Sequence, residues 1–199
     1  FKKRCWQKII HAKITNQSQA LDSNANDDIA YLCSLRGRIT SGDSTNIEAQ
    51  AARAYWSMLF QNFTRHIDEQ DIRNSTLNYG YAVLRGMVAR ALVGVGFLPA
   101  FGLHHCNELN ALNLADDIIE PFRPFVDALT RELLDEDGEE LPLNLPMRYK
   151  ARLLELPSLP CRVGKMETTL SYACELCAES LLRATKAKDA TLIETVSFL

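Results

Sequence analysis

The sequence lacks any apolar run that reads as a membrane span. Its longest apolar stretch, residues 81–101, contains Arg85 and Arg90 as well as glycines and a proline, and charged side chains are costly in a bilayer core. The chain begins at Phe1 and shows no signal-peptide pattern. We therefore expect a soluble, cytoplasmic protein with no membrane association, and the numbering is compatible with a start inside a longer protein.

The sequence also lacks a dense cysteine framework. Six cysteines are scattered over 199 residues, and a chain of this length does not need disulfides for stability, so reduced thiols are expected. Cys174 and Cys177 form a single CxxC pair inside a helical pattern, with no second pair or histidine pair nearby. This context favours buried thiols over a zinc or redox site.

Bulk charge gives no sign of nucleic-acid binding, because the net charge is -3. The charge is unevenly placed, however, and the acidic segment at residues 134–140 is expected to be a solvated turn. Without its five acids the chain would be net positive, which permits a basic face elsewhere. Basic residues gather in two stretches: Lys2, Lys3, Arg4, Lys8 and Lys13, and then Arg148, Lys150, Arg152, Arg162 and Lys165.

Period-two alternation is nearly absent, and helical periodicity predominates. There is no internal repeat, low-complexity tract or long linker. The fold class expected is all-α, a multi-helix bundle forming one domain over residues 1–199. Helices are predicted at roughly 3–20, 27–38, 46–63, 71–97, 107–135, 146–155 and 166–186.

Two of these helices carry specific local signals. Thr45 and Glu48 have the spacing of a capping box at the start of helix 46–63. The helix at 71–97 is apolar nearly all round and should run through the centre of the bundle. Gly80 and Gly86 cost it helix propensity, which suggests close contacts at both positions.

Residues 102–124 carry the most informative chemistry. His104 and His105 precede a mostly apolar helix that nevertheless contains Asp116, Asp117 and Glu120. A carboxylate on an apolar face must be paired, hydrogen-bonded or bound to a metal, because an uncompensated buried charge is expensive. Helical spacing puts the three acids on one face, where they can donate oxygens to a hard divalent ion.

Two prolines follow these acids. Pro121 and Pro124 cannot donate hydrogen bonds to the carbonyls of Asp117 and Glu120. The helix should therefore bend there, and we hypothesise that the bend helps to aim the carboxylates.

Residue spacing alone leaves simpler explanations open. Either histidine can be an ordinary surface or hydrogen-bonded residue, and Glu48 can serve only the capping box. Asp116 and Asp117 can form an exposed edge paired with Arg123. On spacing alone, a metal site is the minority interpretation.

The sequence resembles the CRISPR-associated integrase and endonuclease, the larger of the two universal spacer-adaptation proteins, particularly members from type II systems. The matching segments occur in the family's order and spacing and cover most of the chain. They are residues 12–17 (AKITNQ), 47–56 (IEAQAARAYW), 77–81 (LNYGY), 102–105 (GLHH) and 114–124 (LADDIIEPFRP).

The resemblance implies a site. It makes Glu48, His105 and Glu120 the metal ligands, selects His105 over His104, and assigns Asp117 a supporting catalytic role. Such a set suits Mg²⁺ or Mn²⁺ better than zinc. Arg123 and Arg53 become candidate DNA contacts, although Arg123 can equally bridge to Asp117 or Glu120.

The resemblance also implies a reaction and partners. The 3′-hydroxyl of a captured DNA fragment would attack a phosphodiester at the edge of the CRISPR repeat, joining the two by transesterification in a prokaryotic cytoplasm. Double-stranded DNA, a second copy of the full-length protein and the small adaptation protein would be partners. The family's N-terminal β domain is absent from this chain, which leaves a fragment or a compact form as alternatives.

Two other function classes stay open at this point. A non-catalytic helical module that binds DNA or a partner protein would keep the acids only as structure. A helical metal hydrolase acting on a small substrate would use the same acids without DNA.

Overall fold

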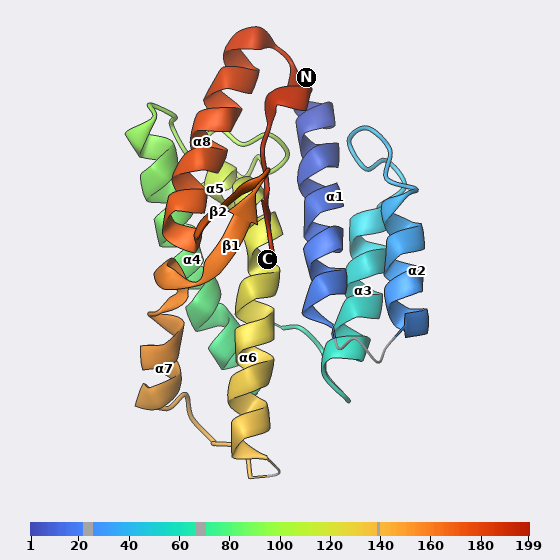
Figure 1. The fold of residues 1–199 in the computed structure, drawn as a ribbon, viewed down its shortest axis with the longest axis vertical. Helices are drawn as coiled ribbons and strands as arrows, with labels where there is room; N and C mark the ends of the chain where they lie inside the picture. Colours follow the sequence, from blue (N-terminus) through green and yellow to red (C-terminus); the bar gives the residue numbers. More distant parts are fainter. Residues whose placement is uncertain (22–25, 67–70, 139) are drawn as a thin grey trace.

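A computed structural model describes residues 1–21, 26–66, 71–138 and 140–199 of the chain. Within them the fold is a helical bundle with one small sheet (Figure 1), which confirms the predicted fold class. The α helices are α1 (Lys2–Ala20), α2 (Asn26–Arg36), α3 (Ile47–Leu59), α4 (Ile72–Gly94), α5 (Asn113–Ile118), α6 (Arg123–Asp137), α7 (Met147–Leu153) and α8 (Leu170–Ala187). Short 3-10 turns are η1 (Glu120–Phe122), η2 (Leu156–Ser158) and η3 (Ala190–Leu192), and the strands are β1 (Pro160–Val163), β2 (Met166–Thr169) and β3 (Val196–Ser197).

Helix α4 forms the centre of the larger half of the bundle, as its composition predicted. It packs against α5, α6, α7 and α8, and Leu77, Leu84, Val88 and Leu92 are buried along it. Its first turn is capped by the carboxylate of Asp71, which accepts a hydrogen bond from the Arg73 N–H at 2.7 Å. This cap fixes where α4 begins.

The two glycines of α4 differ in their surroundings. A Cβ atom at Gly80 would collide with Cγ1 of Val126 and lie 3.1 Å from Cδ2 of Leu153, so α6 and α7 approach the helix closely here. A Cβ atom at Gly86 would meet nothing within 4 Å. The expectation of a close contact is correct for Gly80 and wrong for Gly86.

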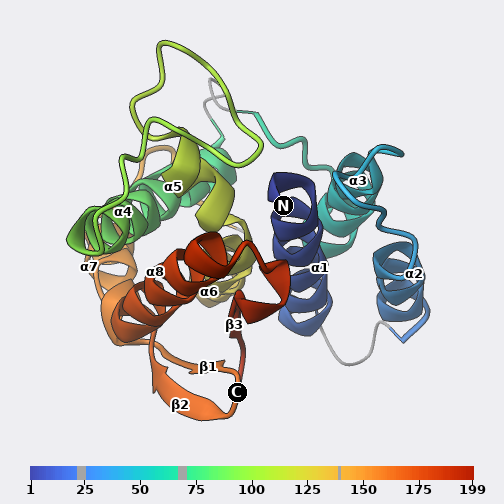
Figure 2. The same ribbon diagram turned by 90° about the horizontal axis from the view of Figure 1, so that it is seen from above.

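Helix α1 lies between two groups of helices. It contacts α2 and α3 on one side and α6 and η1 on the other, and the view from above shows this arrangement (Figure 2). Trp6, Ile9, Ile10 and Ile14 are buried along it. Because both groups pack on α1, its side chains can reach residues from α3 and η1 at once.

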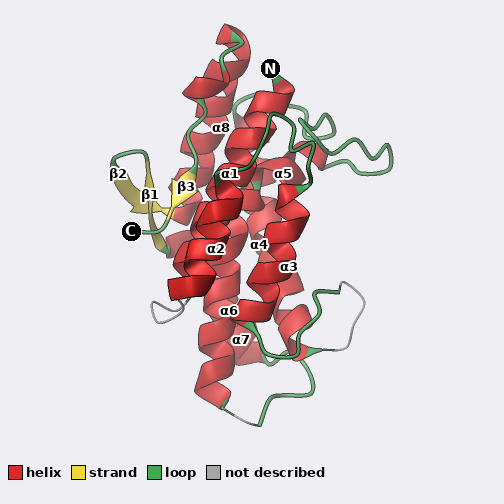
Figure 3. Cartoon of the chain, turned by 90° about the vertical axis from the view of Figure 1, so that its right-hand side faces the viewer, coloured by secondary structure: helices red, strands yellow, loops and turns green. Residues whose placement is uncertain are grey.

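A small antiparallel sheet was not predicted. The strand order is β2-β1-β3, and the sheet lies at one edge of the molecule (Figure 3). The predicted helix at 166–186 is wrong at its start, because residues Met166–Thr169 form β2 and α8 begins only at Leu170. Strands of two to four residues are too short to produce a period-two signal.

The predicted capping box at the start of α3 is wrong. Asn46 is the N-cap residue, in a left-handed conformation with no side-chain cap bond. The carboxylate of Asp43 instead accepts hydrogen bonds from the N–H groups of Ile47 at 2.8 Å and Glu48 at 2.9 Å. The side chain of Glu48 is therefore not engaged in capping and is available for other contacts.

The predicted helix at 107–135 is divided into three parts. Its first residues lie in a loop, α5 ends at Ile118, η1 covers Glu120–Phe122, and α6 begins at Arg123. A straight helix through 117–124 is thus excluded, which confirms the break expected from Pro121 and Pro124. The carbonyl of Pro121 accepts a hydrogen bond from Asn16 Nδ2 at 2.6 Å, which attaches the break to α1.

The acidic segment at residues 134–140 is not simply a solvated turn. Helix α6 continues to Asp137, and Asp137 accepts hydrogen bonds from Arg148 and, at 2.8 Å, from the hydroxyl of Tyr149. Arg152 pairs with Glu132 at 2.6 Å. Part of the second basic stretch is therefore neutralised by α6, and Glu139 lies outside the described residues.

All six cysteines are free, and Cys174 and Cys177 are buried on α8. Burial raises the pKa of Cys174 to about 12 and that of Cys177 above its usual range. The interpretation of this pair as buried thiols is confirmed. No helix in the described parts of the chain combines the length and apolarity required to cross a bilayer.

Candidate metal and phosphodiester site

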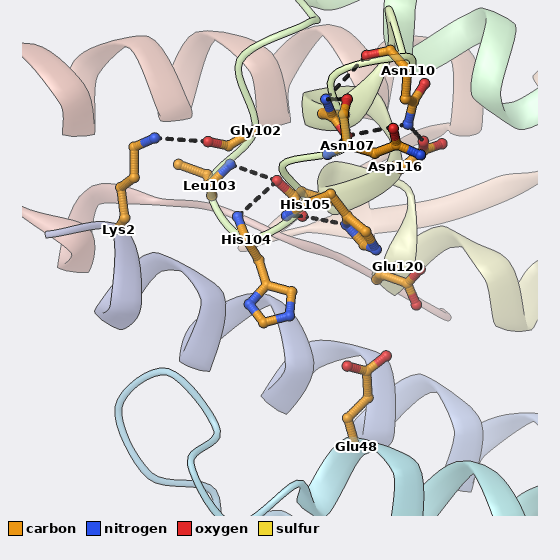
Figure 4. A network of polar contacts seen from close by, with 12 residues as sticks. Lys2, Glu48, Gly102, Leu103, His104, His105, Asn107, Asn110, Asp116 and Glu120 are labelled. Carbon is orange, nitrogen blue, oxygen red and sulfur yellow. Dashed lines mark hydrogen bonds and ion pairs between the residues drawn. The ribbon is translucent and has the colours of Figure 1, made fainter.

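Residues from three distant parts of the chain meet beside α1. Glu48 comes from the first turn of α3, His105 from the loop before α5, and Glu120 from η1. Figure 4 shows the carboxylate of Glu48 pointing toward Glu120, and the imidazole of His105 lies on the side of Glu120 away from Glu48. The three predicted ligand residues are therefore brought to one region.

Asp117 is the anchor of the histidine loop. Its side chain is fully buried, and its carboxylate accepts hydrogen bonds from the backbone N–H groups of Leu103 at 2.5 Å and of His104 and His105 at 3.1 Å. The predicted alternative of an exposed edge paired with Arg123 is wrong for this residue. One buried acid instead fixes the path of three consecutive loop residues.

Asp117 also orients the ring of His105. The Nδ1 atom of His105 lies 2.6 Å from Oδ1 of Asp117, and Nδ1–H must donate because the carboxylate only accepts. This hydrogen bond, opposed by burial, raises the pKa of His105 above its ordinary value. In the neutral ring Nε2 then carries the lone pair, so His105 has the carboxylate-supported geometry typical of a metal-binding histidine.

His104 has a different environment. Its ring stacks on the buried indole of Trp6, with centroids 4.2 Å apart and planes within 2°. The His105 ring meets the same indole edge-on at 5.9 Å. The two histidines thus differ in how they meet Trp6, which the sequence did not single out, and the choice of His105 over His104 stays a prediction.

The histidine loop is held at further points. Asn113 donates from Nδ2 to the carbonyls of Ala100, Asn107 and Asn110 at 2.8–3.0 Å, and Lys2 Nζ donates to Gly102 O at 2.8 Å. A Cβ atom at Gly102 would overlap the carbonyl of His105, so only glycine fits there. The loop is thus preorganised before any ligand binds.

Glu120 is a buried carboxylate held by two cations. Arg123 Nε donates to its Oε1 at 2.8 Å, and Lys13 Nζ lies 2.5 Å from its Oε2. Burial favours the neutral acid, but the charges of Arg123 and Lys13 outweigh it and lower the pKa of Glu120 to about 2. Glu120 is therefore ionised at neutral pH.

Lys13 links Glu48 and Glu120, the two carboxylates that the sequence predicts as ligands. Its Nζ atom lies 2.6 Å from Glu48 Oε1 as well as 2.5 Å from Glu120 Oε2. Burial opposes the charged ammonium, yet the two carboxylates raise the pKa of Lys13 above its usual value. In the sequence Lys13 belongs to a basic stretch, whereas in the fold it is a core residue that is 9% exposed.

Asp116 belongs to a neighbouring ion pair. Arg85 donates to its two oxygens, from Nε at 2.6 Å and from Nη2 at 2.8 Å. Burial alone would raise the pKa of Asp116, but the hydrogen bonds from Arg85 and Asn110 lower it. The assignment of Asp116 as outside the ligand set agrees with this geometry, and Arg85 is a partner that spacing did not identify.

An arginine-lined pocket borders this region. It has a volume of about 350 Å³, and the guanidinium groups of Arg65 and Arg123 both lie over the ring of Tyr81, at 5.4 and 4.6 Å from its centroid. Arg123 thus bridges to Glu120 and also faces the pocket. The lining residues are Arg65, Asn78, Tyr81, Ala82, Arg85, Asp116, Ile119 and Arg123.

Arg53, the other predicted DNA contact, lies apart from that pocket on the exposed face of α3. Its Nε atom donates to the carbonyl of Ala49 at 3.3 Å. It follows Glu48 by five residues on the same helix, a spacing that turns its side chain away from the face that carries Glu48. Its role remains a prediction.

The fit of a divalent cation can be judged from the donors present. Within the described residues no group of three His, Cys, Asp or Glu side chains is arranged closely enough to hold a metal ion. However, Glu120 Oε2 is buried, and the ammonium of Lys13 lies between it and Glu48 Oε1, at 2.5 and 2.6 Å. Carboxylate and imidazole donors around a cation position fit Mg²⁺ or Mn²⁺ in chemistry.

The comparison of sequences identifies a family. The family model for CRISPR associated protein Cas1 matches residues 2–138. The chain is 47% identical over 137 residues to the CRISPR-associated endonuclease Cas1 of Neisseria meningitidis, covering 68% of this chain and 44% of the relative. It is 31% identical over 123 residues to a CRISPR-associated endonuclease Cas1 of Pyrobaculum aerophilum, covering 60% of this chain and 40% of that protein. The chain thus spans less than half the length of these relatives.

Solved structures share the fold. A chain of a partial Cas6-RT-Cas1--Cas2 complex matches with a TM-score of 0.80 at 18% identity, over 98% of this chain and 68% of that chain. A casposase bound to its integration product matches with a TM-score of 0.69 at 22% identity, over 96% of this chain and 67% of that chain. These likenesses extend over the small sheet and α8, beyond the region that the family model matches.

Proposed function

Because the chain belongs to the Cas1 family, we propose that it forms the catalytic part of a divalent-metal-dependent DNA integrase and endonuclease of CRISPR spacer acquisition. The observation that carries this proposal is the meeting of Glu48, His105 and Glu120 beside α1 (Figure 4). The relatives are named endonucleases, which is consistent with a phosphodiester substrate.

In this proposal Glu48, His105 and Glu120 hold Mg²⁺ or Mn²⁺. The cation would polarise a phosphoryl oxygen and offset charge on the attacking and leaving oxygens. Asp117 keeps Nε2 of His105 directed at the site through the 2.6 Å bond to Nδ1. Arg123 keeps Glu120 ionised and holds one of its oxygens at 2.8 Å.

The reaction is a transesterification between two DNA strands. The 3′-hydroxyl oxygen of a captured fragment bonds to a phosphorus atom at the edge of the CRISPR repeat, and the bond from that phosphorus to its former 3′-oxygen breaks. The hydroxyl proton is lost and the departing oxygen gains one, so no external energy source is required. The half-exposed ring of His105 gives the site access to solvent for these protons.

The arginines favour a DNA substrate over a small one. Arg65, Arg85 and Arg123 converge on one pocket next to Glu120, where they can contact phosphates flanking the reacting one. Arg53, exposed on α3 apart from this pocket, is a further candidate for phosphate contact. Binding of branched duplex DNA that weakens steeply as salt rises would support this role and count against a helical hydrolase acting on small molecules.

The partners proposed are double-stranded DNA, a second copy of the full-length protein and the small adaptation protein. Structural neighbours of this fold come from complexes titled Cas1--Cas2, which supports the last of these. A prokaryotic cytoplasmic location follows from the same proposal.

One observation favours the non-catalytic alternative. Each acid of the site already has a basic or hydrogen-bonding partner, since Lys13, Arg123, Arg85 and His105 pair with them. A helical DNA-binding module could retain the acids for these bonds alone. Catalysis therefore has to be tested directly.

The test is integration of a labelled duplex fragment into repeat-containing DNA by the full-length protein in Mn²⁺. We expect Glu48→Ala and His105→Ala to reduce joining by at least about 100-fold, because each removes a donor to the reacting centre. Ser57→Ala, on the exposed end of the same helix α3, is the matched control and should retain activity. Unchanged joining by both site variants would establish the non-catalytic alternative.

A further inference from the structure

The ammonium of Lys13 lies between two carboxylates, where it leaves no room for a second cation. Its ammonium contacts Glu48 Oε1 at 2.6 Å and Glu120 Oε2 at 2.5 Å. These are the oxygens of the two acids proposed to hold the divalent cation. An ammonium and a metal ion cannot both occupy the space between them, because they would share the same ligand atoms and repel each other.

Lys13 is buried, so its position between the two carboxylates is part of the packing of the core. The residue is 9% exposed on the buried face of α1, three and seven positions after Ile10 and Trp6. A buried ammonium without partners is strongly unfavourable. Its two partners come from α3 and η1, so the ion pairs also join the two groups of helices that pack on α1.

The same ion pairs compensate the acids when no metal is bound. The other oxygen of Glu120 is occupied by Arg123 at 2.8 Å, which leaves Oε2 to face Lys13. Without Lys13, Arg123 would still pair with Glu120, but no cation would lie between the carboxylates of Glu48 and Glu120 to offset their repulsion. Lys13 is the described cation that contacts both.

We propose that Lys13 is a tethered cation that occupies the divalent-metal position in the metal-free protein and is displaced when the metal binds. It is a positioning residue that sets metal affinity, and the inference rests on the proposed metal site. The flexible four-carbon stem of lysine allows the ammonium to leave without movement of α1. The metal then takes over the charge compensation that Lys13 provides.

The experiment measures Mn²⁺ binding to the full-length protein by isothermal titration calorimetry. Lys13→Met keeps the apolar stem and removes the charge, so we expect Mn²⁺ to bind about tenfold more tightly. Lys13→Arg retains a competing cation and should bind no more tightly than the unmodified protein. Lys8→Met is the matched control on α1, because Lys8 Nζ donates to the carbonyl of Thr191 at 2.7 Å, away from Glu48 and Glu120.

Thermal unfolding gives a second readout that does not depend on activity. Lys13→Met should melt at a lower temperature than the unmodified protein in EDTA, because two acids lose their shared cation. Saturating Mn²⁺ should remove most of that difference. Lys13→Gln provides the same test if the methionine variant does not fold.

Two failures can be told apart. If Glu48→Gln and Glu120→Gln weaken Mn²⁺ binding but Lys13→Met and Lys13→Gln leave it unchanged or weaker, the metal site stands and the competing role of Lys13 is overturned. If Glu48→Gln and Glu120→Gln do not affect Mn²⁺ binding, the metal site itself is wrong, and the role of Lys13 fails with it.

Discussion

At the scale of single residues, burial distinguishes side chains that look alike in the sequence. Asp116, Asp117, Glu120 and Asp127 are all acids near α6, yet Arg85 pairs with the first, loop N–H groups with the second and Arg123 with the third. Asp127 is 2% exposed, and its partners are the hydroxyls of Tyr55 at 3.1 Å and Tyr81. Its surroundings therefore supply hydrogen bonds without a directly paired cation.

Asp127 should make stability depend on pH. Burial raises its pKa from 3.8 to about 7, against the opposing hydrogen bonds of the tyrosines. The folded state therefore binds more protons than the unfolded state between about pH 4 and pH 7, and the free energy of unfolding falls as pH rises, by up to about 1.4 kcal/mol per pH unit. Asp127→Asn should lack this decline in chemical denaturation measured across that range.

The control for this prediction is Asp71→Asn. Hydrogen bonds from Arg73 lower the pKa of Asp71 despite partial burial, so its contribution is complete above about pH 5 and is lost only as pH falls further. Its stability profile should run parallel to that of the unmodified protein from pH 5 to pH 7. A parallel profile for Asp127→Asn as well would contradict the assigned pKa of Asp127.

At the scale of elements, the sequence predicted the long helices and missed what interrupts them. Repeating apolar positions placed α1, α4 and α8 to within a few residues, because these helices bury a continuous stripe. The loop before α5 is ordered by Asn113 and Asp117, whose hydrogen bonds to carbonyls and N–H groups of the loop produce no periodic pattern of apolar residues. The prolines did reveal the break at η1, because a missing N–H has the same consequence in any fold.

Helix α4 offers a matched pair of substitutions. Gly80→Ala should destabilise the protein by about 1–3 kcal/mol, because the new methyl group collides with Val126 and presses on Leu153. Gly86→Ala should be neutral or stabilising by up to about 1 kcal/mol, because nothing lies within 4 Å and alanine favours helix. Thermal and urea unfolding of both variants measures the difference.

The reverse order of stabilities would show that α4 does not pack on α6 and α7 at Gly80. Equal effects would show that helix propensity alone governs both positions. Either result would contradict the close approach that fixes Tyr81 beside Arg123.

At the scale of the whole molecule, the site depends on contacts that no local pattern contains. The family resemblance named Glu48, His105 and Glu120, and the fold brings them to one region although α3 and η1 are more than sixty residues apart in the sequence; their role as ligands stays a prediction. Lys13 was missed as a site residue. A lysine in register with the buried Trp6 and Ile10 was a sign that could have identified it, but only the fold shows which acids it meets.

We propose that one divalent cation binds between Glu48, His105 and Glu120. Anomalous diffraction from Mn²⁺-soaked crystals of the full-length protein, with and without DNA, tests it most directly. We predict a single strong peak per site, at coordination distance from both carboxylates and from Nε2 of His105, with the ammonium of Lys13 moved away. If the protein joins DNA in Mn²⁺ while its anomalous peak lies elsewhere, or while Lys13 still bridges Glu48 and Glu120, then the cation does not bind between these residues.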